Sequence, residues 1–179
     1  MPYVRKPLAS PAAGAARWLT LACVLAAPLA APTAARAADD KTMAGSACVA
    51  STGNNPGGTK FVLENSALFY ADSGGPLRVD CPIVKERVGK GILSASVFVV
   101  DNNPSAEIRC ALFQRRIAPG VVPTGTATAN RVSAGASTAA RELNLGGLPA
   151  VPGNGSYWFI GCDLAPFTGI LSYFVNEQS

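Results

Sequence analysis

Histidine is absent from this 179-residue sequence, and its absence excludes several kinds of catalytic and metal site. No other side chain has an unperturbed pKa near neutrality, so the general base of a serine-protease triad is missing. Zinc and copper sites built on imidazole are excluded for the same reason. Calcium needs only oxygen ligands, and one turn-like segment offers them: Asp101, Asn102, Asn103 and Glu107. Asp and Asn are typical turn residues in any case, so we predict neither a metal nor a cofactor.

One segment nevertheless matches a protease motif. Residues 72–77, DSGGPL, resemble the active-site segment of chymotrypsin-like serine proteases, although Ala71 stands where that family has glycine. A serine–lysine pair would not need histidine, but Lys85 and Lys90 lie in a charged stretch, KERVGK, that is typical of an exposed turn. We therefore interpret the match as spurious, predict that Ser73 is a turn residue, and predict no catalytic residue.

Long apolar runs are confined to the N-terminus. A region with three basic residues precedes an apolar stretch, residues 18–34, which two prolines interrupt. The small-x-small sequence ARA follows at residues 35–37. This order is typical of a secretory signal peptide and not of a spanning helix, which needs about 20 clean apolar residues. We predict a cleaved signal over residues 1–37, no transmembrane segment after cleavage, and export to the periplasm or the extracellular space.

An excess of charge is also lacking once this signal is removed. All eleven acidic residues lie at or after Asp39, whereas four of the fifteen basic residues lie within the signal, so the remaining chain carries eleven of each. A neutral chain without a basic block gives no electrostatic reason to expect nucleic acid or an anionic membrane as a partner. We therefore predict that nucleic acid is not a ligand.

Four of the five cysteines remain after cleavage: Cys48, Cys81, Cys110 and Cys162. An even number in an exported chain indicates two disulfides, and the absence of any C-x-x-C pair disfavours a zinc site. Three pairings are open. The similar strand-like segments EIRCALF and WFIGCDLA favour Cys110–Cys162, which leaves Cys48–Cys81.

From residue 59 onward, short apolar runs alternate with turn residues, and this pattern is typical of an all-β domain. Residues 38–58 are small and polar, and we interpret them as an N-terminal arm and loop ahead of a domain over 59–179. A strand or a broken pair of strands is expected over residues 59–71. Another strand is expected over residues 77–84, where Pro82 favours an edge or a terminus.

Two hairpins are predicted from pairs of strands around short turns. The first joins residues 92–101 to residues 106–116, and its second strand alternates apolar and polar residues with a period of two. The second joins residues 156–165 to residues 170–177. Between them, residues 117–151 are expected to hold two short strands, with a helix over 138–145 as the alternative.

Roughly six to nine short strands in a chain of this length predict an antiparallel β-sandwich, with jelly-roll or immunoglobulin-like connections. The motifs Asn65-Ser66, Cys81-Pro82 and a terminal C-x-L-x-P…SY-x-V-x-E resemble those of small exported bacterial β-sandwich proteins of uncharacterised function. The last motif comprises Cys162, Leu164, Pro166, Ser172, Tyr173, Val175 and Glu177. This resemblance implies the fold and implies no activity.

The candidate ligand-contact residues are aromatic. Tyr157, Trp158 and Tyr173 gather near the predicted C-terminal hairpin, together with Phe167, and sugars stack on exposed aromatic faces. Because strands alternate, one of Tyr157 and Trp158 is expected in the core. We predict a non-enzymatic exported protein with a binding or structural role and carbohydrate or protein as its partner. The alternatives are a hydrolase that uses two carboxylates and a protein-binding inhibitor or toxin-like effector.

Overall fold

The structure is a computed structural model that describes residues 39–51, 61–71, 75–117, 120, 123–151 and 155–178. The chain divides into two compact units, Met1–Ala35 and Arg36–Ser179, and every described residue belongs to the second. The predicted signal peptide and residues 72–74 of the protease-like motif lie outside the described residues. Within the described residues, no helix is long and apolar enough to cross a membrane.

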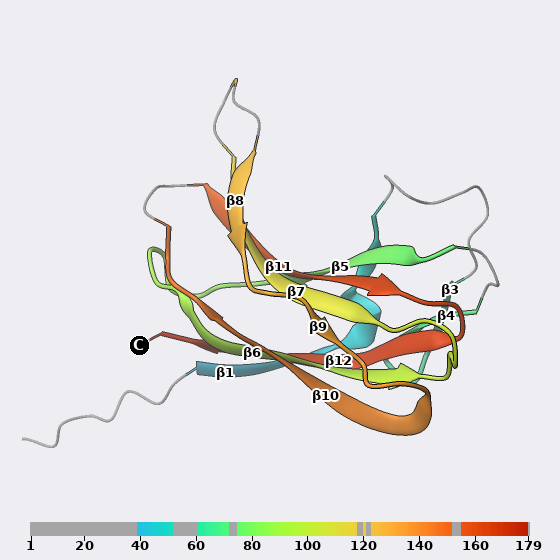
Figure 1. Cartoon of the computed structure of the whole chain (residues 1–179). Coiled ribbons are helices and arrows are strands. Elements are labelled where there is room, and N and C mark those ends of the chain that lie inside the picture. The colour runs from blue at the N-terminus through green and yellow to red at the C-terminus, as the bar shows by residue number, and fades with distance from the viewer. Residues whose placement is uncertain are drawn as a thin grey trace, which may run out of the picture. The chain divides into compact units, whose positions relative to one another are not determined.

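The described residues form two antiparallel sheets (Figure 1). Sheet A has the strand order β10-β6-β12-β4-β3, and β1 also pairs with β12. Its strands are β1 (Asp39–Ala44), β3 (Phe61–Glu64), β4 (Ala67–Tyr70), β6 (Ile92–Asp101), β10 (Ser137–Leu148) and β12 (Thr168–Glu177).

Sheet B has the order β2-β5-β11-β7-β8, and β9 also pairs with β7. Its strands are β2 (Val49–Ala50), β5 (Leu77–Ile83), β7 (Arg109–Arg116), β8 (Thr124–Ala127), β9 (Arg131–Val132) and β11 (Ser156–Leu164). A single 3₁₀ turn, η1 (Gly45–Ala47), joins β1 to the segment that leads into β2.

The hydrophobic core lies between the inner faces of the two sheets. It draws on every long strand, because alternate residues of each strand point inward. Its largest fully buried side chains include Tyr70, Tyr173, Leu77, Ile92, Ile108, Leu112, Ile160 and Leu164. The chain is therefore a β-sandwich, as predicted.

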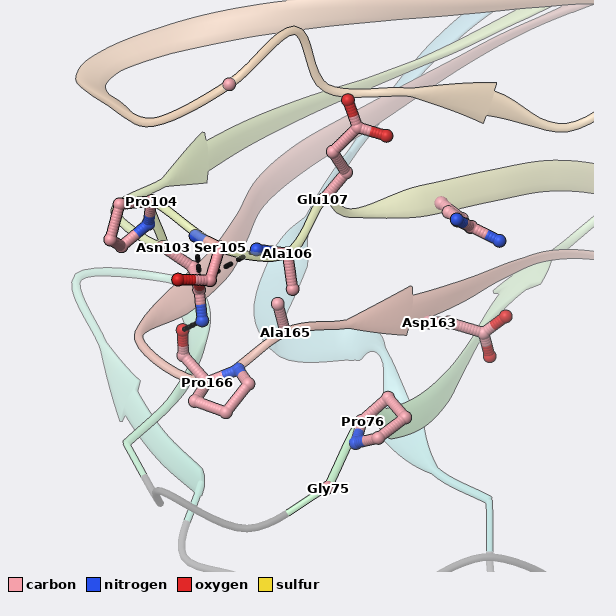
Figure 2. Close-up of a pocket in the computed structure, with 12 residues that line it drawn as sticks. Gly75, Pro76, Asn103, Pro104, Ser105, Ala106, Glu107, Asp163, Ala165 and Pro166 are labelled. Atoms are coloured by element: carbon pink, nitrogen blue, oxygen red, sulfur yellow. Dashed lines mark hydrogen bonds between the residues drawn. The ribbon is translucent and has the colours of Figure 1, made fainter.

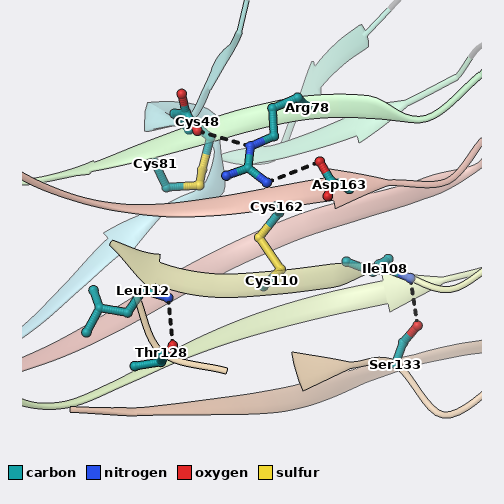
Figure 3. The surroundings of a disulfide bond; sticks show 11 residues. Cys48, Arg78, Cys81, Ile108, Cys110, Leu112, Thr128, Ser133, Cys162 and Asp163 are labelled. Atoms are coloured by element: carbon teal, nitrogen blue, oxygen red, sulfur yellow. Dashed lines mark hydrogen bonds and ion pairs between the residues drawn. A yellow bond between two sulfur atoms is a disulfide. The ribbon is translucent and has the colours of Figure 1, made fainter. Parts of the chain in front are cut away.

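Both predicted disulfides are confirmed, and both lie within sheet B (Figure 3). Cys110 of β7 and Cys162 of β11 are directly opposite each other in the strand register. Cys48 stands just before β2, and the β2–β5 register, continued by one residue, places it opposite Cys81. Directly opposite residues of antiparallel strands approach closely enough to be bridged. Each disulfide thus joins neighbouring strands, unlike the inter-sheet bridge of immunoglobulin domains.

The segment interpreted as an N-terminal arm is part of the sandwich wherever the structure describes it. Residues 39–44 pair with the whole C-terminal half of β12, from Asp39 opposite Glu177 to Ala44 opposite Ser172. Val49 and Ala50 then pair with β5 in the other sheet. The polar composition of this segment gave no sign of a strand, because β1 lies at a sheet edge, where one face and one side of a strand remain solvated.

Both predicted hairpins are wrong, because the strands of each pair lie in different sheets. β6 pairs with β10 and β12, whereas β7 pairs with β11, β8 and β9. β11 and β12 separate in the same way. Each connection therefore crosses from one layer to the other, and the strands that it joins face each other across the core (Figure 1).

Side-chain hydrogen bonds stabilise the first crossing, the connection between β6 and β7. Asp101 Oδ1 accepts the Asn103 N–H at 3.1 Å, and Asn103 Oδ1 accepts the N–H groups of Ser105 and Ala106 at 2.8 and 2.9 Å. Asn103 Nδ2 also donates to the carbonyl of Pro166 at 3.0 Å and so joins the two crossings. The turn's donors are satisfied by side chains and need no partner strand across a hairpin.

The strands predicted around residues 61–71 and 77–84 agree with the structure, whereas the middle segment holds three strands, one of them 12 residues long, and not the two short strands predicted. Within residues 61–71 the chain forms the broken pair, a hairpin of β3 and β4 around Asn65 and Ser66, which both have positive φ, as a type I′ turn requires. The middle segment forms β8, β9 and β10, so the helix over residues 138–145 does not form. Pro82 is in β5, past the residues that pair with the short β2. No backbone hydrogen bond to β2 is lost because proline lacks an N–H.

Candidate functional site

The outer face of sheet B carries a compact cluster of aromatic side chains. Phe159 of β11 lies opposite Phe113 of β7, and Tyr157 lies opposite Arg115. The rings of Phe113 and Phe159 stack with centroids 5.0 Å apart, and those of Tyr157 and Phe159 with centroids 5.7 Å apart. The Arg115 guanidinium lies 5.7 Å from the centre of the Phe159 ring. Phe159 is covered by these neighbours, whereas Tyr157 is 42% exposed. The cluster therefore supports one ring and presents it to solvent.

Arg78 of β5 extends this cluster across β11. Its guanidinium occupies the space above Gly161, where a Cβ would lie 2.1 Å from Arg78 Nη2, so a larger residue at this position would displace the guanidinium. The guanidinium lies 5.1 Å from the centre of the Phe113 ring and donates to Asp163 Oδ1 at 3.2 Å (Figure 3). Asp80 Oδ1 is 3.5 Å from Arg78 Nε, an ion-pair separation without a hydrogen bond. Arg78 is thus neutralised and held in place on the sheet.

Two adjoining hollows meet at Tyr157, and we call them together the Tyr157 groove. The first has a volume of about 410 Å³, and the second has a volume of about 480 Å³. They share Ile83, Tyr157 and Trp158. Charged residues line both: Arg78, Asp80 and Arg115 the first, Lys85 and Arg87 the second.

The buried carboxylate of Glu177 binds the loop that forms one wall of the groove. Glu177 of β12 is 1% exposed, and it accepts the backbone N–H groups of Glu86 at 3.1 Å and Arg87 at 3.2 Å. Lys41 Nζ of β1 donates to the same carboxylate at 2.9 Å and to the Val84 carbonyl at 3.0 Å. The loop that carries Lys85 and Arg87 is therefore fastened to sheet A.

These contacts set the protonation of the pair. Burial alone raises the pKa of the Glu177 carboxyl, but the bonds from Lys41, Glu86 and Arg87 outweigh it, and the pKa lies below its usual value. Desolvation lowers the pKa of Lys41, but its bonds to Glu177 and Glu86 outweigh that effect and leave the pKa above its usual value. The structure therefore favours the ion pair over the neutral pair.

Lys85 lies against the indole of Trp158. Its Nζ is 4.8 Å from the ring centre and donates to the carbonyl of Lys90. Burial lowers the pKa of Lys85, and the charge of Lys41 adds to this effect while that of Glu177 opposes it. Trp158 thereby positions a cation at the edge of the groove.

The predicted aromatic residues have three different positions. Tyr157 is exposed in the groove, whereas Trp158 is 4% exposed and belongs to the core, with one edge on the groove. Tyr173 is 1% exposed, and its hydroxyl donates to the Pro82 carbonyl at 2.7 Å; burial raises its pKa to about 12. Tyr173 is thus a core residue that joins the sheets. Phe167 is exposed, but Tyr157 is near the start of β11 and Phe167 follows its end.

Sequence reasoning missed Phe113, Phe159, Arg78 and Arg115 as parts of this surface. Alternation along β7 already places Phe113 and Arg115 on one face, and the same rule pairs Tyr157 with Phe159 on β11. The missing information was that β7 and β11 are neighbours. The predicted hairpins assigned each of them a different partner.

A larger pocket, of about 650 Å³, lies where the β6–β7 connection meets the β11–β12 connection, and Figure 2 shows its lining. Proline and alanine supply five of its twelve lining residues, and the Asn103 side chain is occupied by the bonds described above. Glu107 and Asp163 both line it, but their carboxylates point in different directions (Figure 2), and Asp163 accepts a bond from Arg78. We call this the crossing pocket.

The calcium interpretation of residues 101–107 finds no support in the geometry. Asp101 is 1% exposed, and its two carboxylate oxygens accept bonds from the Asn103 N–H and from Ser133 Oγ. Ser133 in turn accepts the N–H of Ile108 at 2.9 Å. Within the described ranges, no group of three acidic or cysteine side chains is placed to hold a metal.

No protein-family model matches the chain, and no curated protein matches it in sequence. Among solved structures, it is similar to a low-affinity xylan-binding module, CBM86, from Roseburia intestinalis, with 11% identity and a TM-score of 0.45. That match covers 78% of this chain and 96% of the module. It is also similar to a Podospora anserina GH26-CBM35 β-(1,4)-mannanase, with 9% identity and a TM-score of 0.43, over 78% of this chain and 28% of the mannanase. Neither likeness bears on the ligand of this chain.

Proposed function

We propose that this protein is an exported, non-enzymatic module that binds carbohydrate in the Tyr157 groove. The observation that carries the proposal is the exposed Tyr157 ring, which is supported by Phe159 and lies between two hollows with charged walls. Export, the periplasmic or extracellular location and kinship with small exported bacterial β-sandwich proteins are part of the same proposal. The two disulfides support it, because such bonds persist in oxidising compartments.

The chemistry of the groove suits a sugar chain. The C–H faces of a pyranose ring pack on an aromatic ring, while hydroxyl groups around its rim need charged or polar partners. Tyr157 offers the ring, and Arg78, Asp80 and Arg115 offer donors and acceptors beside it. Because the stack on Phe159 fixes the Tyr157 ring, little side-chain entropy is lost on binding.

The crossing pocket gives less support to a hydrolase. Glycoside hydrolysis needs two carboxyl groups that face each other across the scissile bond. Glu107 and Asp163 point in different directions, and Asp163 is bonded to Arg78 (Figure 2). The pocket also has no aromatic residue in its lining on which a sugar could stack.

Binding of the mature protein to a panel of soluble polysaccharides, measured by affinity electrophoresis and titration calorimetry, tests this proposal. We expect Tyr157→Ala to weaken binding about tenfold, the cost of a central aromatic contact. Phe167→Ala removes an exposed aromatic ring that lies beyond the other end of β11, and it serves as the matched control, with unchanged binding.

Two results would overturn the proposal. One is the absence of binding to every polysaccharide in the panel by a folded, oxidised protein. The other is binding that Tyr157→Ala leaves intact while substitutions in the crossing pocket abolish it. Release of reducing sugar by the wild-type protein would contradict the non-enzymatic assignment.

A further inference from the structure

The Tyr157 groove carries an excess of positive charge. Four of its lining residues are basic, and the single acid, Asp80, is paired with Arg78, which Asp163 also neutralises. Arg115, Lys85 and Arg87 remain, and none of them has a carboxylate within ion-pair distance among the described residues.

This excess is local. With the predicted signal removed, acidic and basic residues are equal in number, so no general basicity of the chain places cations here. They come from separate elements: Arg115 from β7, and Lys85 and Arg87 from the loop after β5. A hollow lined by one sign of charge attracts ligands of the opposite sign.

The cations are also held in position. Arg115 lies against the Phe159 ring, and Lys85 lies against Trp158 while it donates to the Lys90 carbonyl. The backbone of Arg87 is fastened by Glu177. Charged side chains that are already positioned lose less entropy when they bind an anion.

We propose that the ligand of the groove is an anionic polysaccharide whose sugars carry carboxylates, a polyuronate; this inference rests on the proposed carbohydrate-binding function. Tyr157 packs against one sugar ring, and the guanidinium groups of Arg115 and Arg87 receive carboxylates of that sugar or its neighbours. Arginine matches a carboxylate with two parallel hydrogen bonds, which a neutral sugar cannot accept in the same way.

A polyuronate fits these observations better than the other anionic polymers. Single-stranded nucleic acid is bound by several aromatic rings on which successive bases stack, and the groove presents one exposed ring. An acidic peptide would use the cations but would leave the Tyr157 ring without a flat partner. The combination of one ring and flanking cations matches a sugar acid.

The experiment compares polygalacturonate with its fully methyl-esterified form, which keeps the backbone and removes the charge. We expect the mature protein to bind polygalacturonate at least tenfold more tightly than the ester. We also expect this preference to shrink as sodium chloride is raised, because salt screens exposed charges. Single-stranded DNA and poly-L-glutamate of similar length serve as anionic polymers without sugar acids.

Variants that each remove one positive charge test which residues bind the carboxylates of polygalacturonate. Arg115→Gln and Arg87→Gln should each lower affinity for polygalacturonate about fivefold, as the loss of one exposed charge pair predicts, and leave affinity for the ester unchanged. Arg109→Gln is the matched control, since Arg109 lies on the same face of β7 and lines the crossing pocket. It should bind as the wild type does.

Each outcome is decisive. Equal binding of polygalacturonate and its ester, with both lost in Tyr157→Ala, overturns the anionic ligand and leaves the carbohydrate function standing. Binding of DNA or poly-L-glutamate as tight as that of polygalacturonate overturns the sugar-acid specificity. Loss of polygalacturonate binding in Arg109→Gln alone places the site in the crossing pocket, and no binding of any glycan overturns both proposals.

Discussion

Three aromatic residues that lie close together in the chain or the sheets have unrelated roles in this molecule. Tyr157 is exposed on the outer face of sheet B, Trp158 packs in the core beside Lys85, and Tyr173 joins the two sheets by a hydrogen bond to Pro82. The opposite roles of Tyr157 and Trp158 follow from strand alternation. The burial of Tyr173 does not, because it depends on which face of β12 meets sheet B.

The Tyr173 hydroxyl provides a prediction at the residue scale. Its pKa is raised from 10.0 to about 12, so the folded state holds this proton more tightly than the unfolded state. The stability that the group contributes is complete below pH 10 and is lost as the pH rises toward 12. We expect Tyr173→Phe to cost about 1 kcal/mol at neutral pH and to reduce the loss of stability above pH 10.

Urea unfolding of the wild type and Tyr173→Phe between pH 7 and pH 11.5 measures both effects. Tyr157→Phe is the control, because it removes the hydroxyl of an exposed tyrosine and should leave the stability unchanged. Parallel pH profiles for wild type and Tyr173→Phe would show that Tyr173 does not contribute to alkaline unfolding.

At the scale of elements, β1 connects the N-terminal segment to the wall of the groove. Lys41 of β1 and Glu177 of β12 meet at the loop that carries Arg87, so the edge strand, the C-terminal strand and the groove are coupled. The positions of the apolar strands were predictable from alternation, but neither the strand β1 nor this contact was. Lys41 and Glu177 are 136 residues apart, and no local pattern indicates that they meet.

This coupling predicts the response to acid. The pKa of Glu177 is lowered, so its contribution to stability is complete above the usual value of 4.5 and is lost as the pH falls through the lowered value in the folded state. Lys41→Met should cost about 2–4 kcal/mol at neutral pH, because it leaves a buried carboxylate without its cation. It should also remove much of the acid-dependent loss.

The double variant Lys41→Met with Glu177→Gln is the control, since the amide carries no charge, keeps an oxygen to accept a backbone N–H of the loop and should regain most of the stability. Denaturant midpoints at pH 3, 5 and 7 measure these differences. A double variant as unstable as Lys41→Met would show that the cost arises from lost packing and not from the unpaired charge.

At the scale of the whole molecule, two disulfides fasten β2 to β5 and β7 to β11, and so hold four strands that contribute residues to the groove. Each closes a loop of several tens of residues, which restricts the unfolded chain by about 3–4 kcal/mol in the entropic model. Such bonds need the oxidising compartment that the predicted signal peptide would provide.

The intact mass of the protein recovered from an exporting host tests this link. We expect a chain that begins after Ala37 or Ala38 and is four hydrogens lighter than the fully reduced form. Alkylation without prior reduction should leave the mass unchanged. A retained N-terminus would refute the signal peptide, and four alkylated thiols would refute the disulfides in the exported form.

The sequence by itself determined the class of fold, the absence of a histidine-based site and the number of disulfides, because these depend on composition, on a local period of two and on the parity of four cysteines. It favoured Cys110–Cys162 and Cys48–Cys81 but left three pairings open. Only the tertiary structure decided which strands hydrogen-bond and which face each other across the core. Asp101 and Asn103 satisfy the turn locally, so the same residues suit either outcome, and burial between distant strands selects one. That choice placed Tyr157 beside Arg115 and Arg87, and thereby gathered positive charge on a chain that is neutral without its predicted signal.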